Sequence, residues 1–126
     1  MLRSFLNAKI AGLRITGTNL EYQGSITLDD RYIEKVGILA NEEVHVLNLE
    51  NGNRLTTYVI RGVRGSGIVE LNGPAARMGM VGDRIMILTY ALFTAEEIAT
   101  HVPRIHRVKT PKKSNRAEIF GTCGTV

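Results

Sequence analysis

Apolar and polar residues alternate along much of this chain, in short runs that are separated by turn residues. Residues 13–16 and 44–49 alternate with a period of two, which predicts strands with one buried and one exposed face. Residues 54–60 and 68–71 are rich in β-branched and other strand-forming residues and predict two more strands. The stretch 84–92 is the most apolar, and we expect it in the interior of a sheet.

Helical patterns are short and few. Asp29 or Asp30 is expected to cap a helix that ends at Val36, with Gly37 as its C-terminal stop. Residues 72–78 predict a single helical turn.

Two local motifs predict further points where the chain turns. Asn51-Gly52 lies between two predicted strands, and because both residue types tolerate positive φ it predicts a type I′ hairpin. The stretch 94–97 has the Thr-x-x-Glu spacing of a capping box, which predicts the start of a last short helix.

The composition narrows the fold class. The chain has 126 residues and 13.9 kDa, the size of one domain, with 13 Gly against 3 Pro. Several short strands joined by glycine-rich turns predict a mainly β fold, a small closed barrel with a few short helices. From Pro103 onward the chain is polar and basic, and we expect an edge strand at the start of this segment and mobility near its end.

The net charge of +4 comes from that last segment. Residues 1–100 carry 10 Lys and Arg against 11 Asp and Glu, whereas residues 101–126 carry 6 against 1. The tail cations are Arg104, Arg107, Lys109, Lys112, Lys113 and Arg116. Such charge gives non-specific phosphate affinity, so a nucleic-acid-binding barrel is one alternative function. Against it, Trp is absent and no aromatic residues alternate with the tail cations as a stacking platform requires.

Other classes of protein are disfavoured by what the sequence lacks. No apolar run approaches the length of a membrane span, and the first residues do not resemble a secretory signal, so we expect a cytoplasmic protein. The single cysteine, Cys123, and the three histidines lack the spacing of a metal site, so we expect no metal. We interpret His45, inside a predicted strand, as structural.

Gly24-Ser25 is the stretch with the most distinctive chemistry. A serine hydroxyl attacks the carbonyl group of the preceding residue when the backbone bends toward it, and a preceding glycine permits that bend. The product is an ester, which undergoes elimination more readily than an amide. Alone, the dipeptide is weak evidence of such a reaction, since the chain has a second Gly-Ser pair at Gly65-Ser66. The glycines at 62, 65 and 67 are not followed by Lys-Ser or Lys-Thr, and we interpret them as a turn rather than a phosphate loop.

The Gly-Ser pair is one of a series of motifs in a fixed order. The series consists of Lys9, Tyr22-x-Gly24-Ser25, Gly37-Ile38-Leu39, Asn51-Gly52-x-Arg54-x-x-Thr57-Tyr58, Arg64-Gly65-Ser66, Asn72-Gly73-Pro74-Ala75-Ala76 and Val81-Gly82-Asp83. With these motifs the chain resembles the pyruvoyl-dependent aspartate 1-decarboxylases from Met1 to about Pro103. The resemblance implies a catalytic domain over 1–103, followed by a basic tail over 104–126.

The resemblance also implies self-processing. The chain would cut itself between Gly24 and Ser25 into a β chain of residues 1–24 and an α chain of residues 25–126. Ser25 would become a covalent pyruvoyl group, in place of pyridoxal phosphate, and Thr57 would help to hold the Gly24 carbonyl. The pyruvoyl ketone would form a Schiff base with L-aspartate, which would lose its α-carboxylate as CO₂ and yield β-alanine for pantothenate and coenzyme A synthesis.

Further site residues follow from the same resemblance. Tyr58 matches the proton donor, a role that suits a phenol because it is protonated at neutral pH. Lys9 and Arg54 match positions that bind the substrate carboxylates, and an Arg does so through two parallel hydrogen bonds. Thr57 is placed with them, as are residues of the loop around the pyruvoyl group, and Tyr22 lines the pocket. The loop residues are Asn72, Gly73, Pro74 and Ala75.

The resemblance implies a closed six-stranded double-psi β-barrel and a homotetramer of four α and four β chains, with active sites between neighbours. The sequence departs from the family at Ala11 and Leu47, where many members have His and Trp, so finer pocket contacts are not carried over. A second alternative function is a paralogue that never processes itself. It is disfavoured by the presence of Gly24-Ser25, Thr57 and Tyr58.

Overall fold

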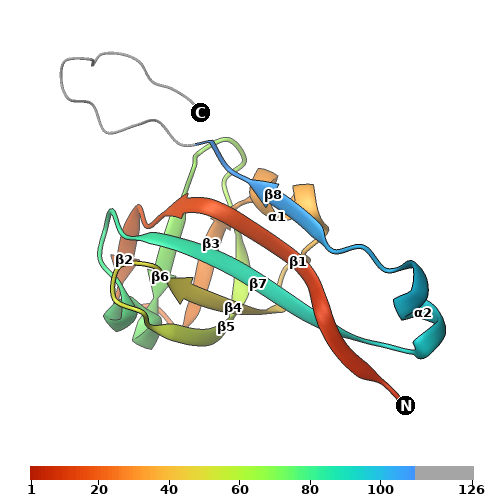
Figure 1. The fold of residues 1–126 in the computed structure, drawn as a ribbon. Coiled ribbons are helices and arrows are strands. Elements are labelled where there is room, and N and C mark those ends of the chain that lie inside the picture. Colours follow the sequence, from red (N-terminus) through yellow and green to blue (C-terminus); the bar gives the residue numbers. More distant parts are fainter. Residues whose placement is uncertain (110–126) are drawn as a thin grey trace.

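The computed structural model describes residues 1–109, which form one mainly β unit with three short helices (Figure 1). The strands are β1 (Arg3–Arg14), β2 (Gly17–Asn19), β3 (Ser25–Asp29), β4 (Glu43–Asn48), β5 (Arg54–Gly62), β6 (Val69–Asn72), β7 (Arg84–Phe93) and β8 (Arg104–Arg107). The helices are α1 (Asp30–Val36), the 3₁₀ helix η1 (Gly73–Met78) and α2 (Ala95–Thr100). The mainly β class predicted from the sequence is confirmed.

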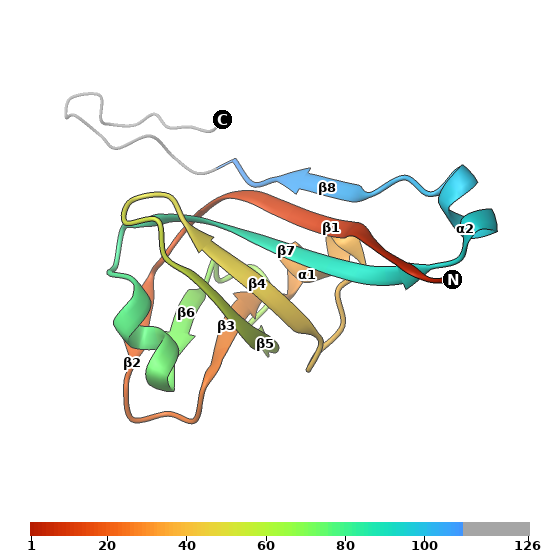
Figure 2. The same cartoon turned by 60° about the horizontal axis from the view of Figure 1, so that its bottom comes forward.

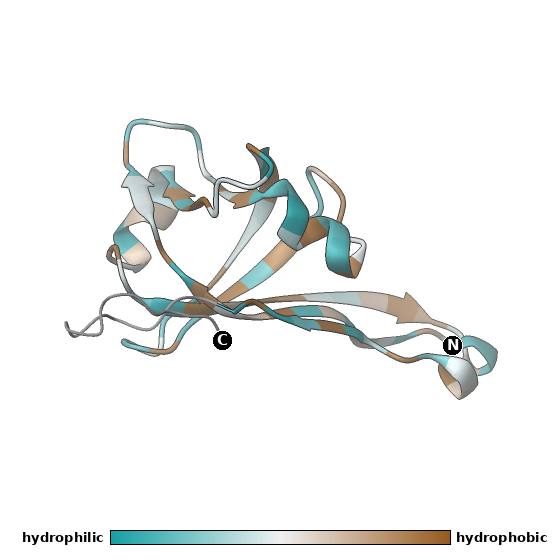
Figure 3. Cartoon of the chain, turned by 90° about the horizontal axis from the view of Figure 1, so that it is seen from above, coloured by the Kyte–Doolittle hydropathy of each residue, from teal (hydrophilic) through white to brown (hydrophobic). Residues whose placement is uncertain are grey.

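A long antiparallel ribbon of β1 and β7 runs the length of the molecule, and β8 adds to the outer side of β1 in parallel (Figure 2). The remaining elements stack on one side of this ribbon, and its far end projects beyond them with the N-terminus and α2 (Figure 3). Ring contacts and a hydrogen bond of His101 stabilise this end of the ribbon. Phe93 lies 4.2 Å from His101 between ring centroids, and His101 Nε2 lies 2.8 Å from the Leu6 carbonyl oxygen.

The eight strands follow the order β2-β6-β3-β5-β4-β7-β1-β8. The apolar strand β7 lies inside the sheet, between β4 and β1, as predicted. Hydrogen-bonded pairing ends at β2 and β8, so the closed six-stranded barrel is not confirmed by the strand pairing. Only Ile15 and Thr16 separate β1 from β2, and their amides donate to the carbonyls of Asp83 and Val69.

The core is formed by the inward-facing positions of the strands. Ile10, Ile26, Val44, Val59 and Ile87 come from five different strands and have essentially no exposed surface. Burying a side chain of this kind contributes about 2 kcal/mol. Because inward and outward residues alternate along a strand, this core fixes which residues of each strand face outward.

The predicted helix boundaries are confirmed. Asp29 caps α1 by accepting a hydrogen bond from the Arg31 amide at 2.8 Å, and Gly37 ends the helix with φ 74°, a value glycine adopts without steric cost. The helical turn expected at 72–78 is η1. α2 begins with the predicted capping box between Thr94 and Glu97.

The predicted turn type at Asn51-Gly52 is wrong, although β4 and β5 do form a hairpin. A type I′ turn needs positive φ at both residues, and only Gly52 has it, at 76°. The loop is instead closed by the Asn48 amide, which donates to the Asn53 carbonyl, and by the Gly52 amide, which donates to the Asn48 carbonyl. The Asn51 side chain accepts from the Asn53 amide, a local bond that asparagine makes without positive φ.

The predicted tail begins with the expected edge strand, β8, and Val108 behind it packs in the core. The rest of that segment, with Lys112, Lys113, Arg116 and Cys123, lies outside the described residues, and so does the predicted mobility of its end. Within residues 1–109, no helix is long and apolar enough to cross a membrane. The same residues contain no group of three or more His, Cys, Asp or Glu that could hold a metal ion.

Candidate active site

Ser25 begins β3 in a strained backbone conformation. Its φ is 135°, a region that residues with a side chain rarely adopt, and it has no exposed surface. Its strand partner on β6 is Asn72, which is also fully buried. Strain of this kind costs of order 1–3 kcal/mol and persists only where the surrounding structure imposes it. The predicted cleavage point therefore coincides with a strained and fully buried residue.

The Asn72 side chain contacts two hydroxyl groups of β3. Its Nδ2 donates to Ser25 Oγ at 2.8 Å and to Thr27 Oγ1 at 2.9 Å, while its Oδ1 is buried without a hydrogen-bond partner in the described part of the chain. Thr27 belongs to none of the motifs described from the sequence. Its position two residues after Ser25 could have indicated it, because residues i and i+2 of a strand share a face.

The loop that follows Asn72 lies against the backbone just before Ser25. Gly73 has φ 62°, and a β-carbon at this position would lie 2.5 Å from Gly24 N and 2.7 Å from Tyr22 O. A β-carbon at Gly24 would lie 3.9 Å from Cδ of Pro74. Tyr22 is 49% exposed, while Ala75 is buried in η1. The structure thus brings together the predicted cleavage point and the predicted loop.

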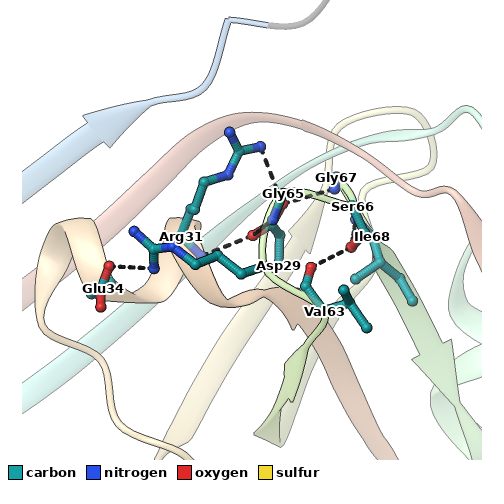
Figure 4. A network of polar contacts seen from close by, with 9 residues as sticks. Asp29, Arg31, Glu34, Val63, Gly65, Ser66, Gly67 and Ile68 are labelled. Carbon is teal, nitrogen blue, oxygen red and sulfur yellow. Dashed lines mark hydrogen bonds and ion pairs between the residues drawn. The ribbon is translucent and has the colours of Figure 1, made fainter.

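The other end of β3 is held by Asp29. Its carboxylate accepts from the amides of Gly65 (3.1 Å) and Gly67 (2.7 Å) as well as from Arg31 (Figure 4). Burial alone would raise the pKa of Asp29, but these donors outweigh it and lower the pKa to about 2. Arg64 and Glu34 form a second link between the 63–68 turn and α1. Gly65 and Gly67 thus lie in a turn that follows β5, as predicted from the sequence, and Gly62 is the last residue of that strand.

β5 divides the predicted residues between its two faces. Arg54 and Tyr58 are exposed on the outward face, whereas Thr57 points the other way and is half-buried. The pairing of β5 with β3 begins at Val59 and Ile26, so Thr57 stands two residues before it on β5, as Gly24 does on β3. Within residues 1–109 no hydrogen bond joins their atoms, so the predicted role of Thr57 stays a prediction.

Lys9 lies on the same outward face but on a distant strand. It pairs with Leu88, Leu88 pairs with His45, and His45 pairs with Thr56, so these residues form one row across β1, β7, β4 and β5. Three strand spacings separate the ends of the row, a distance of about 14 Å. Lys9 and Arg54 therefore come from strands that lie three spacings apart on this face.

His45 is not the fully satisfied structural histidine that its strand position suggests. Its ring contacts Tyr90 edge-to-face at 5.2 Å, and Nδ1 is buried with no partner among the described residues. His45, Tyr90 and Arg54 border an open hollow of about 520 Å³ on the outward face. Leu47 pairs with Arg54 on this face, whereas Ala11 is buried in β1.

Comparison with known proteins decides the family. A family model described as aspartate decarboxylase matches residues 1–116. The chain belongs to the aspartate decarboxylase family. The match includes β8 and extends past Pro103, where the sequence resemblance had ended.

Relatives in this family carry the name aspartate 1-decarboxylase. The chain is 53% identical over 105 residues to the protein of Exiguobacterium sibiricum, covering 83% of each chain. It is 49% identical over 122 residues to that of Caldicellulosiruptor saccharolyticus, covering 94% of this chain and 95% of the relative. It is 50% identical over 105 residues to that of Staphylococcus aureus, covering 83% of each.

Among solved structures, the chain is similar to a rationally designed protein with 21% sequence identity and a TM-score of 0.49. The similarity covers 66% of this chain and 91% of the designed one. It is too low to bear on the fold or the function of this member of the aspartate decarboxylase family.

Proposed function

We propose that this protein is a pyruvoyl-dependent carboxy-lyase that converts L-aspartate to β-alanine and CO₂. Family membership and about 50% identity to proteins named aspartate 1-decarboxylase support the reaction. The observation that carries the proposal is Ser25, which is fully buried, strained at φ 135° and held by Asn72 next to Gly24.

The first step is an autocatalytic rearrangement of the chain. Ser25 Oγ bonds to the Gly24 carbonyl carbon, the Gly24 C–N bond breaks, and the hydroxyl proton passes to the released nitrogen of residue 25. The strained backbone at Ser25 favours this shift because the broken amide releases the strain. Thr57, which precedes the pairing of β5 with β3 by two residues as Gly24 does, is proposed to stabilise the carbonyl oxygen as negative charge develops on it.

The second step removes Oγ from residue 25. Water acting as the base takes the proton on the α-carbon, the bond from Cβ to Oγ breaks, and its electron pair stays on Oγ, which becomes part of the Gly24 carboxylate. Hydrolysis of the dehydroalanine that is left releases ammonia and gives the pyruvoyl group at the start of the α chain. When formed, this ketone supplies an electron sink for the loss of CO₂.

The surroundings of residue 25 fit a small planar group of this kind. Asn72 offers an amide donor to Ser25, Gly73 and Pro74 continue the loop against Gly24, and Ala75 is buried in η1. Tyr22 is expected to close the solvent side, since its side chain is half-exposed just before the cleavage point.

Substrate binding is assigned to the outward face. Arg54 is proposed to hold a carboxylate of aspartate through a bidentate pair, and Lys9 to supply a second positive charge. Tyr58, which is 38% exposed on the same face of β5 as Arg54, is proposed to donate the proton that replaces CO₂. The distance between Lys9 and β5 supports a site that is completed by a neighbouring copy.

We further propose that the strands close into a six-stranded double-psi β-barrel, with β8 outside it. In support, β1 and β2 are nearly continuous, and they pair with β7 at one end of the strand order and with β6 at the other. A cytoplasmic homotetramer of four α and four β chains completes the proposal.

Intact mass of the purified protein tests this function directly. We expect two fragments, residues 1–24 and 25–126, after warm incubation, with the second fragment lacking a free amino group. Borohydride reduction in the presence of L-aspartate should add the substrate to the larger fragment. A chain that stays full-length, or that is cut but takes up no substrate, contradicts the proposal and leaves the non-processing paralogue as the alternative.

A further inference from the structure

The Asn72 amide group has both of its N–H bonds occupied by β3. Nδ2 donates to Ser25 Oγ at 2.8 Å and to Thr27 Oγ1 at 2.9 Å, and no other side-chain hydrogen bond of Thr27 is found within residues 1–109. Ser25 and Thr27 lie two residues apart on β3, and Asn72 is the β6 partner of Ser25. Thr27 is therefore the second anchor of the group that touches the nucleophile.

The number of buried amide groups left without a partner decides which end of the Asn72 amide faces Ser25. In the observed orientation one buried acceptor, Asn72 Oδ1, is left without a partner. The opposite orientation would place Oδ1 against both hydroxyls and leave the two N–H groups without acceptors. A buried N–H without a partner is the rarer and costlier case. Thr27 favours the observed orientation because it accepts the N–H that Ser25 leaves free.

We propose that Thr27 is a positioning residue for self-processing, acting through Asn72. This inference rests on the proposed self-cleavage. By holding the amide with an N–H toward Ser25 Oγ, Thr27 provides a hydrogen-bond donor to the atom on which the electron pair is left when the bond between Cβ and Oγ breaks. A donor fixed at that oxygen stabilises the departing Gly24 carboxylate without further reorganisation.

Removal of the Thr27 hydroxyl allows the Asn72 amide to rotate. One of its N–H groups then lacks an acceptor. The free-energy preference for the orientation with an N–H toward Ser25 is therefore smaller. The loss of one such hydrogen bond is worth about 1 kcal/mol, which corresponds to a slowing of about five- to tenfold. The ester between Gly24 and Ser25 should accumulate, because its elimination is the step that the donor assists.

The decisive variants are Thr27→Val, which keeps the shape and β-branching, and Thr27→Ser, which keeps the hydroxyl. Thr18→Val is the matched control, because Thr18 lies on β2, the other strand that pairs with β6, and is exposed. Each full-length chain is made by cell-free synthesis, and its cleavage is followed by intact mass. Hydroxylamine added at intervals cleaves the ester but not the amide, and so measures its share. Thermal unfolding midpoints are compared in parallel.

We expect Thr27→Val to process about five- to tenfold more slowly with a larger hydroxylamine-sensitive share, while Thr27→Ser and Thr18→Val process like wild type. Wild-type rates in Thr27→Val overturn the inference. So does equal slowing in Thr27→Ser, which would assign the effect to the lost methyl group, or slowing that merely follows a lower unfolding midpoint. A wild-type chain that never cleaves overturns the proposed function as well, so the two failures are distinguishable.

Discussion

Gly73 lies against the backbone of Gly24, so closely that a β-carbon at position 73 would come within 2.5 Å of Gly24 N. The same β-carbon would lie 2.7 Å from Tyr22 O. Both neighbours are backbone atoms, which cannot yield by a change of rotamer. The 72–75 loop therefore restricts the conformation of the chain at the cleavage point.

Gly73→Ala should slow self-processing about tenfold. The methyl group pushes the Gly24 backbone away from its position beside Ser25, and a displacement that costs about 1.4 kcal/mol slows the reaction about tenfold. Gly52→Ala is the control, because Gly52 has a similar positive φ of 76° but open space around it. Intact mass over time compares the two. If Gly52→Ala slows cleavage as much as Gly73→Ala, the effect is general backbone strain and not contact with Gly24.

Ser25→Ala should remain a single chain of 126 residues and show no decarboxylase activity, because it lacks the oxygen that attacks Gly24. Ser66→Ala tests the specificity of this result, since Gly65-Ser66 is the second Gly-Ser pair of the chain. Ser66 Oγ bonds locally to the Val63 carbonyl at 2.6 Å, in a turn away from Asn72. Ser66→Ala should be cut after Gly24 like wild type. Cleavage in Ser25→Ala would show that a protease, not the chain itself, makes the cut.

The local elements of this fold could be predicted from sequence where side chains act on their own neighbours. Asp29 and Gly37 delimit α1, and Thr94 opens α2, because caps depend on groups within a few residues. The type of turn at Asn51 could not be predicted in this way, because the asparagine side chain offers the backbone a competing hydrogen bond. Strand β3, the segment Ser25–Asp29, is not among the strands predicted from the pattern.

The candidate site could be predicted as residue types but not as an arrangement. Ser25 and Asn72 are 47 residues apart in the sequence, and only the pairing of β3 with β6 brings them together. Thr27 and the strain at Ser25 depend on that pairing, so no local pattern predicts them. The separation of Lys9 from Arg54 likewise depends on strand order, which the sequence pattern leaves open.

Tyr58→Phe should separate maturation from catalysis. The phenol lies on the outward face of β5, opposite to Thr57, so its loss should leave cleavage after Gly24 unchanged. A general acid contributes about 10²-fold or more, and kcat for aspartate should fall accordingly. Fragment masses report the first effect, and β-alanine formation reports the second. Full turnover in Tyr58→Phe would assign the proton to another donor.

Asp29→Asn should destabilise the fold in a pH-dependent way. The folded-state pKa of Asp29 is lowered to about 2, so the stabilisation by the ionised carboxylate is complete above its ordinary unfolded pKa near 4. It is lost as pH falls from there through the folded value. The size of the shift corresponds to about 2 kcal/mol at neutral pH. Asparagine still caps α1, so the difference reports the charge-assisted bonds of the carboxylate to Gly65, Gly67 and the Arg31 guanidinium.

Urea unfolding measures this effect best in the Ser25→Ala background, where the chain stays in one piece, at a fixed protein concentration. We expect Asp29→Asn to lower the free energy of unfolding by about 2 kcal/mol near pH 7 and by clearly less near pH 3. Asp30→Asn is the control: its partner Arg61 has a 65% exposed side chain, and an exposed pair of this kind contributes less than about 1 kcal/mol. A deficit in Asp29→Asn that is independent of pH would mean that shape and not ionisation holds the 63–68 turn against α1.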